Sequence, residues 1–380
     1  MSNPIHSTSA KSVLPMLAMR GLATGLCAGC VVGLLRLSHD RAAARVALWL
    51  EEWREVWWTV PIWFGVLVAL AVILRRIVRE EPLISGSGIP QTELALAGRL
   101  SFTWWRVLLA KFLGSWLALF GGLALGREGP SIQMGGAVGA GFHALWRPAA
   151  PHALTGSPYV VAGAVAGLAA AFGAPAAGVL FAFEEMKSRR DTSLIVAACA
   201  SAIGAHLMIR IVFGMGRILP FAGFEAPPLS SFWIVALEGA VFGVLGVGYN
   251  KTLLWLHDRE AGQTLIPDRW RALPPLLLAG CLALFAPLLI GGGESLIIFV
   301  GEHDVALKTL ILLLAFKYLF AQYSTVASIP GGLLMPILCL GALWGRLWAE
   351  LPVSALAAHG LASGSVQPYV LFGMVSYFAA

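Results

Sequence analysis

Charged side chains are scarce in this sequence. Only 12% of its 380 residues are Asp, Glu, Lys or Arg, against roughly 25% in a soluble globular domain. Hydrophobic residues make up 58%, and several apolar runs reach the ~20 residues needed to cross a bilayer. The composition therefore excludes an ordinary soluble domain. We predict an all-α, polytopic membrane protein whose surroundings are a lipid bilayer.

Cysteine is also sparse, and its placement excludes a disulfide framework. Of five cysteines, Cys27 and Cys30 form one Cys-x-x-Cys inside an apolar helix, without a second pair or a His partner. We interpret them as small packing residues rather than a metal or redox site. No metal and no cofactor is expected. The first dozen residues lack the charged, apolar and cleavable pattern of a signal peptide.

A charge excess suited to nucleic acid is missing too. The formal net charge is only +6, and the basic residues gather near helix ends, where they set topology. Arg75, Arg76 and Arg79 follow the second apolar segment and mark the cytoplasmic side. Two spans separate them from the N-terminus, so residues 1–15 are expected to be a cytoplasmic tail and residues 16–380 a transmembrane domain.

Glycine (43) and proline (21) are plentiful, which suits close helix packing and interrupted helices. Gly163 and Gly167, four residues apart, have a close-packing spacing. Residues 39–55 are expected to be a charged connector with an amphipathic middle. The apolar segments expected to be helical are 16–37, 57–77, 105–125, 131–145, 159–172, 176–186, 194–213, 232–256, 273–290, 306–322, 336–348 and 369–380.

Three helix starts are interrupted by Gly and Pro, at residues 86–90, 126–130 and 331–336. Broken helices whose N-termini converge at mid-membrane can hold an anion with their free N–H groups and positive dipole ends. Non-helical backbone at that depth is tolerated only where it is buried or lines a cavity. The breaks in both halves suggest two inverted-topology repeats, residues 16–215 and 230–380.

The second start carries a charged pair, Arg127-Glu128. An intramembrane ionisable residue is by default a functional hypothesis. Gly129 permits close backbone approach, and Pro130 suits a first helical turn. Glu128 can therefore compete with a diffusible anion for the helix N-terminus. The alternative is a glutamate settled at a helix start and paired with Arg127.

The first start places the hydroxyl of Ser87, a neutral donor, beside free N–H groups, although Ser87 can equally be an ordinary N-cap. A hydrolase with Ser87 as nucleophile would need a general base within reach, and the His residues show no convincing pairing. Glu184 and Glu185 end the 176–186 helix on the cytoplasmic side. They are either functional or a solvated edge paired with the following Lys and Arg residues.

Four segments, in this order and spacing, resemble the CLC family of chloride channels and chloride/proton antiporters. They are GSGIPQ (86–91), GREGPSIQMGG (126–136), AGLAAAFGAPAAGVLFAFEEM (166–186) and PGGLLMP (330–336). The resemblance covers the chain from about residue 16. It implies a homodimer of two inverted-repeat subunits in the plasma membrane, which is the inner membrane in a bacterium.

The resemblance also implies roles for individual residues. Glu128 is the external gating glutamate: it blocks the anion path when charged, swings away when protonated, and carries the proton. Glu185 hands protons to the cytoplasm, and Glu184 flanks the water path that feeds it. Ser87 donates its hydroxyl to the anion. The complete set of chloride-binding residues implied is Ser87, Gly88, Ile89, Gly129, Leu333 and Leu334.

The expected function is therefore exchange of chloride for protons. Glu185 favours an antiporter over a passive voltage-gated-type chloride channel, because a channel needs no second proton acceptor. Ser87 and Pro130 fit the chloride-transporting pattern better than the fluoride-transporting one. Residues 369–380 are too short to span, while the family continues with further helices, so the second repeat is expected to be incomplete. An inactive fragment and an intramembrane hydrolase are the remaining alternatives.

Overall fold

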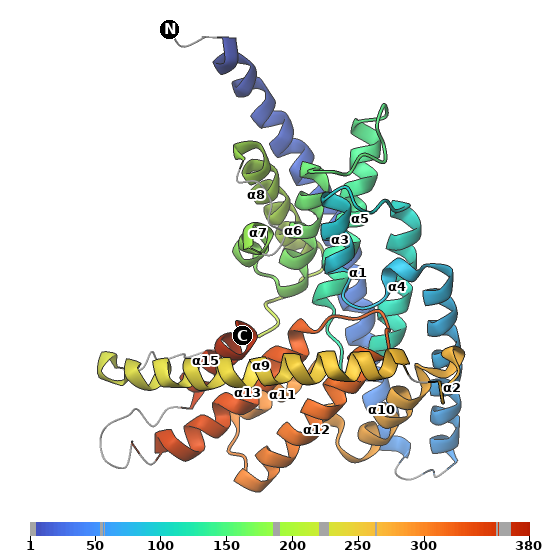
Figure 1. Ribbon diagram of the computed structural model, residues 1–380, viewed down its shortest axis with the longest axis vertical. Helices are drawn as coiled ribbons and strands as arrows, with labels where there is room; N and C mark the ends of the chain where they lie inside the picture. Colours follow the sequence, from blue (N-terminus) through green and yellow to red (C-terminus); the bar gives the residue numbers. More distant parts are fainter. Residues whose placement is uncertain are drawn as a thin grey trace.

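The computed structural model describes residues 5–53, 56, 58–184, 191–219, 228–262, 264–354, 356 and 366–380. These residues are predominantly helical, with isolated β-bridges and no strand among them. The expectation of an all-α protein is confirmed. Figure 1 shows the helices α3 to α8 gathered in the upper part of the view, and α9 to α13 in the lower part.

The first half contains eight α-helices within the described ranges, together with a short 3-10 helix and a π-helical turn. Their bounds are α1 Ile5–Trp53, α2 Thr59–Glu80, η1 Pro82–Ile84, α3 Ile89–Leu96, α4 Trp104–Phe120, α5 Glu128–Trp146, α6 Pro158–Phe172, α7 Pro175–Glu184, α8 Thr192–Leu207 and η2 Met208–Val212.

The second half has more 3-10 turns among its described residues. Its bounds are η3 Leu229–Ser231, α9 Phe232–Gly262, η4 Asp268–Trp270, α10 Leu273–Phe285, η5 Pro287–Leu289, α11 Glu294–Glu302, α12 Leu307–Val326, α13 Leu334–Trp348, η6 Ala349–Val353 and α15 Gln367–Phe378.

Three expectations about helices differ from the structure. Residues 16–37 and the described part of the connector, 39–53, form one continuous helix, α1, because residues 39–53 are rich in Ala, Leu, Arg and Glu and contain no Gly or Pro to break it. The short helix α11 was missed. The expected helix at 131–145 begins three residues earlier, at Glu128, since Gly and Pro are both compatible with a first turn.

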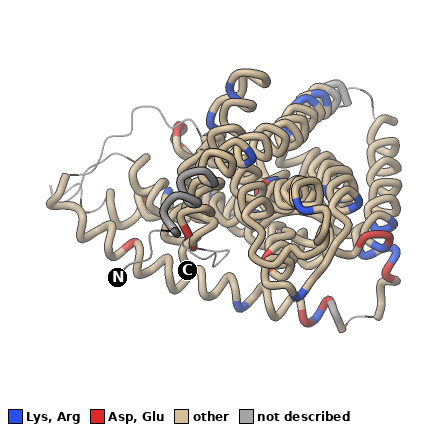
Figure 2. Tube along the Cα trace, turned by 90° about the horizontal axis from the view of Figure 1, so that it is seen from above, with Lys and Arg blue, Asp and Glu red and all other residues tan. Residues whose placement is uncertain are grey.

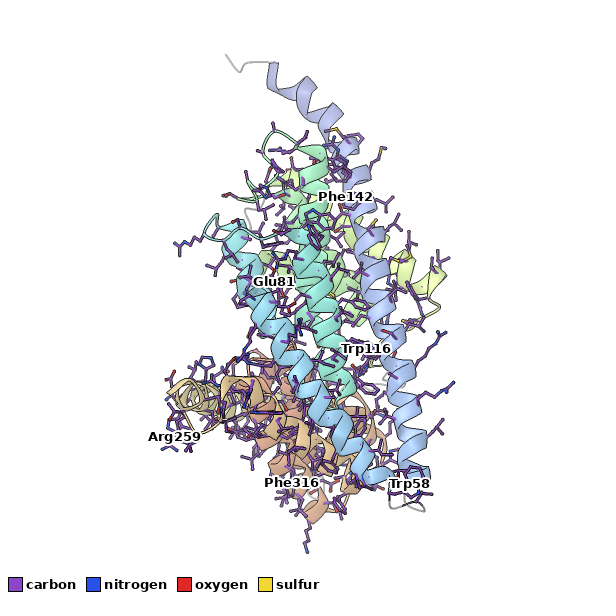
Figure 3. All side chains as sticks on the ribbon, turned by 90° about the vertical axis from the view of Figure 1, so that its right-hand side faces the viewer. Trp58, Glu81, Trp116, Phe142, Arg259 and Phe316 are labelled. Carbon is purple, nitrogen blue, oxygen red and sulfur yellow. The ribbon has the colours of Figure 1, made fainter. Side chains whose placement is uncertain are left out.

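The long helices are suited to a bilayer. Within the described residues, six are long and apolar enough to cross a membrane, and few charged residues interrupt the helices in Figure 2. Apolar side chains such as Ile62, Val66 and Val244 remain exposed, where lipid can cover them. Figure 3 shows α2 end to end, between Trp58 and Glu81. The chain is a multi-pass integral membrane protein.

Helices α5 and α6 pack with their backbones in contact. A Cβ atom added to Gly163 would overlap the carbonyl oxygen of Gly135, and one added to Gly167 would overlap that of Ser131. The predicted close-packing role of Gly163 and Gly167 is confirmed. This contact buries almost the whole of α5, which fixes the position of its N-terminus inside the protein.

The two halves repeat one local arrangement. In the first half, Gly86 and Gly88 have φ of 67° and 88°, and α3 begins directly after them. In the second half, Gly291 and Gly293 have φ of 66° and 101°, and α11 begins directly after them. Only glycine enters this backbone region without strain. The turn at residues 291–293 is therefore a fourth interrupted helix start, counted over both halves. The sequence analysis did not identify it.

A buried lysine supports each of these turns. In the second half, the Nζ atom of Lys317 on α12 donates to the carbonyl oxygens of Leu289 and Gly291 at 2.9 and 2.7 Å. The side chain is fully buried. A lysine in this position gives hydrogen bonds to carbonyl groups that no helix satisfies, and it places a cation next to the turn.

We predict that Gly163→Ala lowers the free energy of unfolding by about 1–3 kcal/mol, because an extra methyl group must separate two backbones in contact. The matched control is Gly65→Ala on α2, where an added Cβ meets nothing within 4 Å. That variant should be neutral or slightly stabilising, since Ala is the better helix former. Thermal unfolding of both purified proteins in detergent measures the difference. Equal transition temperatures would contradict the packing argument.

Candidate functional site

The three interrupted starts that the sequence indicated lie together in the structure, joined by their backbones. The N–H of Gly86 donates to Ile329 O at 3.3 Å, and the N–H of Gly331 donates to Gly86 O at 3.0 Å. Gly126 and Gly332 exchange two N–H···O bonds of 2.7 Å each. The break before α13 thus lies between the breaks before α3 and α5, and one cluster contains three helix N-termini.

Close contact at Gly129 brings the first turn of α5 onto the Ser87 turn. A Cβ added to Gly129 would lie 2.8 Å from the Cβ of Ser87. Gly88, in the left-handed conformation, precedes α3. The Oγ atom of Ser87 accepts the N–H of Ile89 at 3.3 Å, but the N-cap residue of α3 is Gly88, so Ser87 is not the ordinary N-cap of the alternative interpretation. A hydroxyl that accepts this bond still has its own proton to donate, which is compatible with the anion-binding interpretation.

Lys111 also stabilises the turn that contains Ser87. Its Nζ atom on α4 donates to the carbonyl oxygens of Ile84 and Gly86 at 2.8 and 2.6 Å. The lysine is fully buried, so its charge is only weakly screened by water. The sequence analysis did not single out Lys111, although the rule that intramembrane ionisable residues are functional would have identified it.

The starts of α5 and α13 have the same local construction. Helix α13 begins at Leu334 after the N-cap Leu333, and Pro336 is its third residue, as Pro130 is in α5. The first backbone donations into these helices come from Ser131 and Ile337. The N–H groups before these positions are the ones that a helix leaves without an internal partner. They are available to an anion at the junction.

Glu128 is fully buried at the first position of α5. Within the described part of the chain, neither of its carboxylate oxygens has a hydrogen-bond partner. The carboxylate lies over the backbone of Gly126, since a Cβ there would meet Glu128 Oε2. Burying an unpaired carboxylate is costly, so this side chain is poised either to take up a proton or to move.

Arg127 does not pair with Glu128 in this structure, so the alternative interpretation of the sequence does not hold. Its Nη1 donates to Oδ1 of Asp40 and its Nη2 to Oε2 of Glu294, both at 3.0 Å. Consecutive helical residues point in different directions, which separates the two side chains. Asp40 on α1 and Glu294 on α11 lie far from Arg127 in sequence, and sequence reasoning gave them no role.

A cavity of about 390 Å³ opens beside this ion-paired group. His39, Gly126, Arg127, Gly293 and Glu294 are among its lining residues. It therefore connects the turn before α5 with the turn before α11. A cavity with room for several water molecules next to the buried Arg127 suits the passage of ions and protons.

Glu184, the described member of the proposed internal pair, lies in different surroundings from Glu128. Glu184 is the last residue of α7 and is exposed, whereas Glu128 is fully buried. Glu185 lies outside the described residues. The structure therefore brings together Ser87, Gly88, Ile89, Gly129 and Glu128 with the α13 start, and leaves the inner end of a proton route as a prediction.

Comparison with known proteins gives a consistent result. The profile of a family described as voltage gated chloride channel matches residues 64–380. The H(+)/Cl(-) exchange transporter ClcA of Vibrio campbellii is 33% identical over 365 residues, which cover 93% of this chain and 76% of that protein. ClcA of Klebsiella pneumoniae is 30% identical over 377 residues, covering 97% and 78% respectively.

Solved structures agree. The crystal structure of a slow cyanobacterial Cl⁻/H⁺ antiporter superposes with a TM-score of 0.84 at 26% identity, covering 95% of this chain and 84% of that one. A CLC-type fluoride/proton antiporter superposes with a TM-score of 0.72 at 19% identity, covering 100% of this chain and 88% of that one. The second likeness concerns the fold alone.

Proposed function

This chain belongs to the voltage gated chloride channel family, and on that premise we propose that it exchanges chloride for protons across the membrane. The observation that carries the proposal is Glu128, a fully buried carboxylate without a hydrogen-bond partner among the described residues. It lies where three helix N-termini meet. Relatives with 30–33% identity are named as H(+)/Cl(-) exchange transporters.

Chloride would bind where the helix starts converge. The hydroxyl of Ser87 and the backbone around Gly88 and Ile89 contribute from the α3 start. Gly129 contributes from the α5 start, and Leu333 and Leu334 from the α13 start. Backbone N–H groups and dipole ends attract an anion without fixing it to one full positive charge. Such binding permits release, which a transporter needs.

Coupling follows from competition for this site. Charged Glu128 is attracted to the same N–H groups as chloride, so the carboxylate and the anion exclude each other. A proton removes the charge of Glu128 and weakens that attraction. Chloride then replaces the side chain of Glu128, and the proton moves with that side chain. The transport cycle needs no covalent step, which makes the protein a transporter rather than an enzyme.

The inner proton route would run through Glu185, with Glu184 beside the water path. The exposed end of α7 suits proton exchange with the cytoplasm. Residues 16–215 and 230–380 would be inverted repeats with a cytoplasmic tail at 1–15, a proposal supported by the repeated turns at Gly86–Gly88 and Gly291–Gly293. The subunit would pair as a homodimer in the plasma membrane, the inner membrane in a bacterium.

We predict that Glu128→Gln keeps chloride flux and loses coupled proton movement, by about tenfold or more, because a positioned proton carrier typically contributes a factor of 10²–10⁴. Purified protein in liposomes, with a chloride electrode and a pH electrode, measures both fluxes. The control is Glu80→Gln, whose side chain is 64% exposed at the end of α2 and should behave as the unaltered protein. Proton pumping that persists in Glu128→Gln would overturn the role of Glu128.

The Glu185→Gln variant tests the inner route. Removal of its titratable group should stop proton transport while chloride still crosses, since the anion site does not include this side chain. Glu184→Gln serves as the neighbouring variant and should retain part of the proton flux. If proton and chloride fluxes are unchanged in Glu185→Gln, the acidic pair is a solvated helix end.

A further inference from the structure

A second buried arginine, Arg36, lies on α1 one turn before Asp40. Arg36 of α1 is only 4% exposed. Its Nη1 donates to Ala170 O at 2.8 Å and its Nη2 to Gly216 O at 3.3 Å. Both partners are neutral carbonyls, and in the described part of the chain Arg36 forms no ion pair with a carboxylate. Its charge is therefore not cancelled by direct contact, and Asp40, one turn further along α1, accepts a hydrogen bond from Arg127, the neighbour of Glu128.

Arg127 has the opposite arrangement, with two carboxylates on one guanidinium. Asp40 and Glu294 each accept a 3.0 Å hydrogen bond from it. Together these three residues carry one net negative charge. Asp40 lies four residues after Arg36 on α1, so both side chains lie on one face of that helix. Glu294 reaches Arg127 from the start of α11.

Five charged groups are thus linked through Arg127, its neighbour Glu128 and one turn of α1, and two of them, Arg127 and Glu294, line the cavity. Arg36 and Arg127 are positive, while Asp40, Glu294 and ionised Glu128 are negative. When Glu128 binds a proton, the charges of this group balance. Because Glu128 is completely buried and Arg36 nearly so, water screens their interaction less than it would at a surface.

Three further titratable groups, His39, Lys111 and Lys317, have contacts of their own. His39 on α1 lies 3.5 Å from Asp40. Lys111 on α4 and Lys317 on α12 are buried and donate to the carbonyl groups of the flanking turns. These three groups are left unaltered in every variant below, so their contributions stay constant across the comparison.

We propose that Arg36 and Glu294 tune, in opposite directions, the outer pH at which Glu128 takes up its proton. The inference rests on the proposed gating role of Glu128. A negative charge near a carboxylate favours its protonated form, and a positive charge favours its ionised form. Removing Glu294 therefore makes protonation harder, both directly and by leaving Arg127 with one carboxylate. Removing Arg36 makes protonation easier.

The experiment measures chloride-driven proton uptake into liposomes as a function of outer pH, with the complete chain. Glu294→Gln should move the midpoint to lower pH and Arg36→Gln to higher pH, each by about half a unit to one unit. A charge within ~4–6 Å shifts a titration by 1–3 units, and water in the cavity weakens the effect. The matched controls are the exposed residues Glu302→Gln on α11 and Arg41→Gln on α1, which should leave the midpoint in place.

Charge-conserving variants separate electrostatics from packing. Arg36→Lys and Glu294→Asp keep each charge and should restore a midpoint close to that of the unaltered protein. If Arg36→Gln yields no folded protein, Glu294→Gln decides alone: an acid shift supports the proposal and an unchanged midpoint overturns it. Shifts of both neutral variants in the same direction would also overturn it.

Measurements on the Glu128→Gln variant distinguish a failure of the proposed function from a failure of the tuning by Arg36 and Glu294. With no titratable gate, Glu294→Gln should have no effect on the pH dependence of chloride flux. Proton coupling that survives in Glu128→Gln would refute the proposed function itself. If Glu128→Gln abolishes coupling, but Arg36→Gln and Glu294→Gln produce no opposite shifts, only the tuning by these two residues is refuted.

Discussion

The reciprocal backbone hydrogen bonds between Gly126 and Gly332 are the constraint on which the rest of the structure depends. Two N–H···O bonds of 2.7 Å join the break before α5 to the break before α13, and so join the first half of the chain to the second. Extended backbone at this depth must find partners inside the protein. By pairing with each other, the two breaks satisfy that need and bring helix N-termini together that no continuous helix could supply.

Glycine at the junction sets what the site can bind. Gly129 lies against Ser87, and Gly332 lies against Gly129, at distances that leave no room for a Cβ atom. The backbones at the junction therefore lie in direct contact, and the N–H groups of its helix starts are the donors that an anion would meet. Glu128 belongs to the same junction but has no hydrogen-bond partner among the described residues. In the proposed function, one location would accommodate either a carboxylate or a diffusible anion, and a proton on Glu128 would decide between them.

Much of this arrangement could be predicted from the sequence, because the Gly/Pro breaks are local signals. Interrupted starts at these three places follow directly from them, although α5 and α13 begin at Glu128 and Leu334, within the breaks rather than after them. The turn before Glu294 was missed because α11 is short and its glycines resemble a linker. The partners of Arg127 could not be predicted, since Asp40 and Glu294 reach it only through the tertiary fold. Arg36 was overlooked because its partners, the carbonyl groups of Ala170 and Gly216, are distant in sequence.

The most direct test of the central claim is made on the unaltered protein in liposomes. A chloride gradient is imposed, and proton movement is recorded with the membrane potential first free and then clamped at zero. Exchange predicts that protons move uphill under both conditions, because the chloride gradient alone drives them. Chloride flux accompanied by no uphill proton movement at zero potential would contradict the account and identify a passive channel.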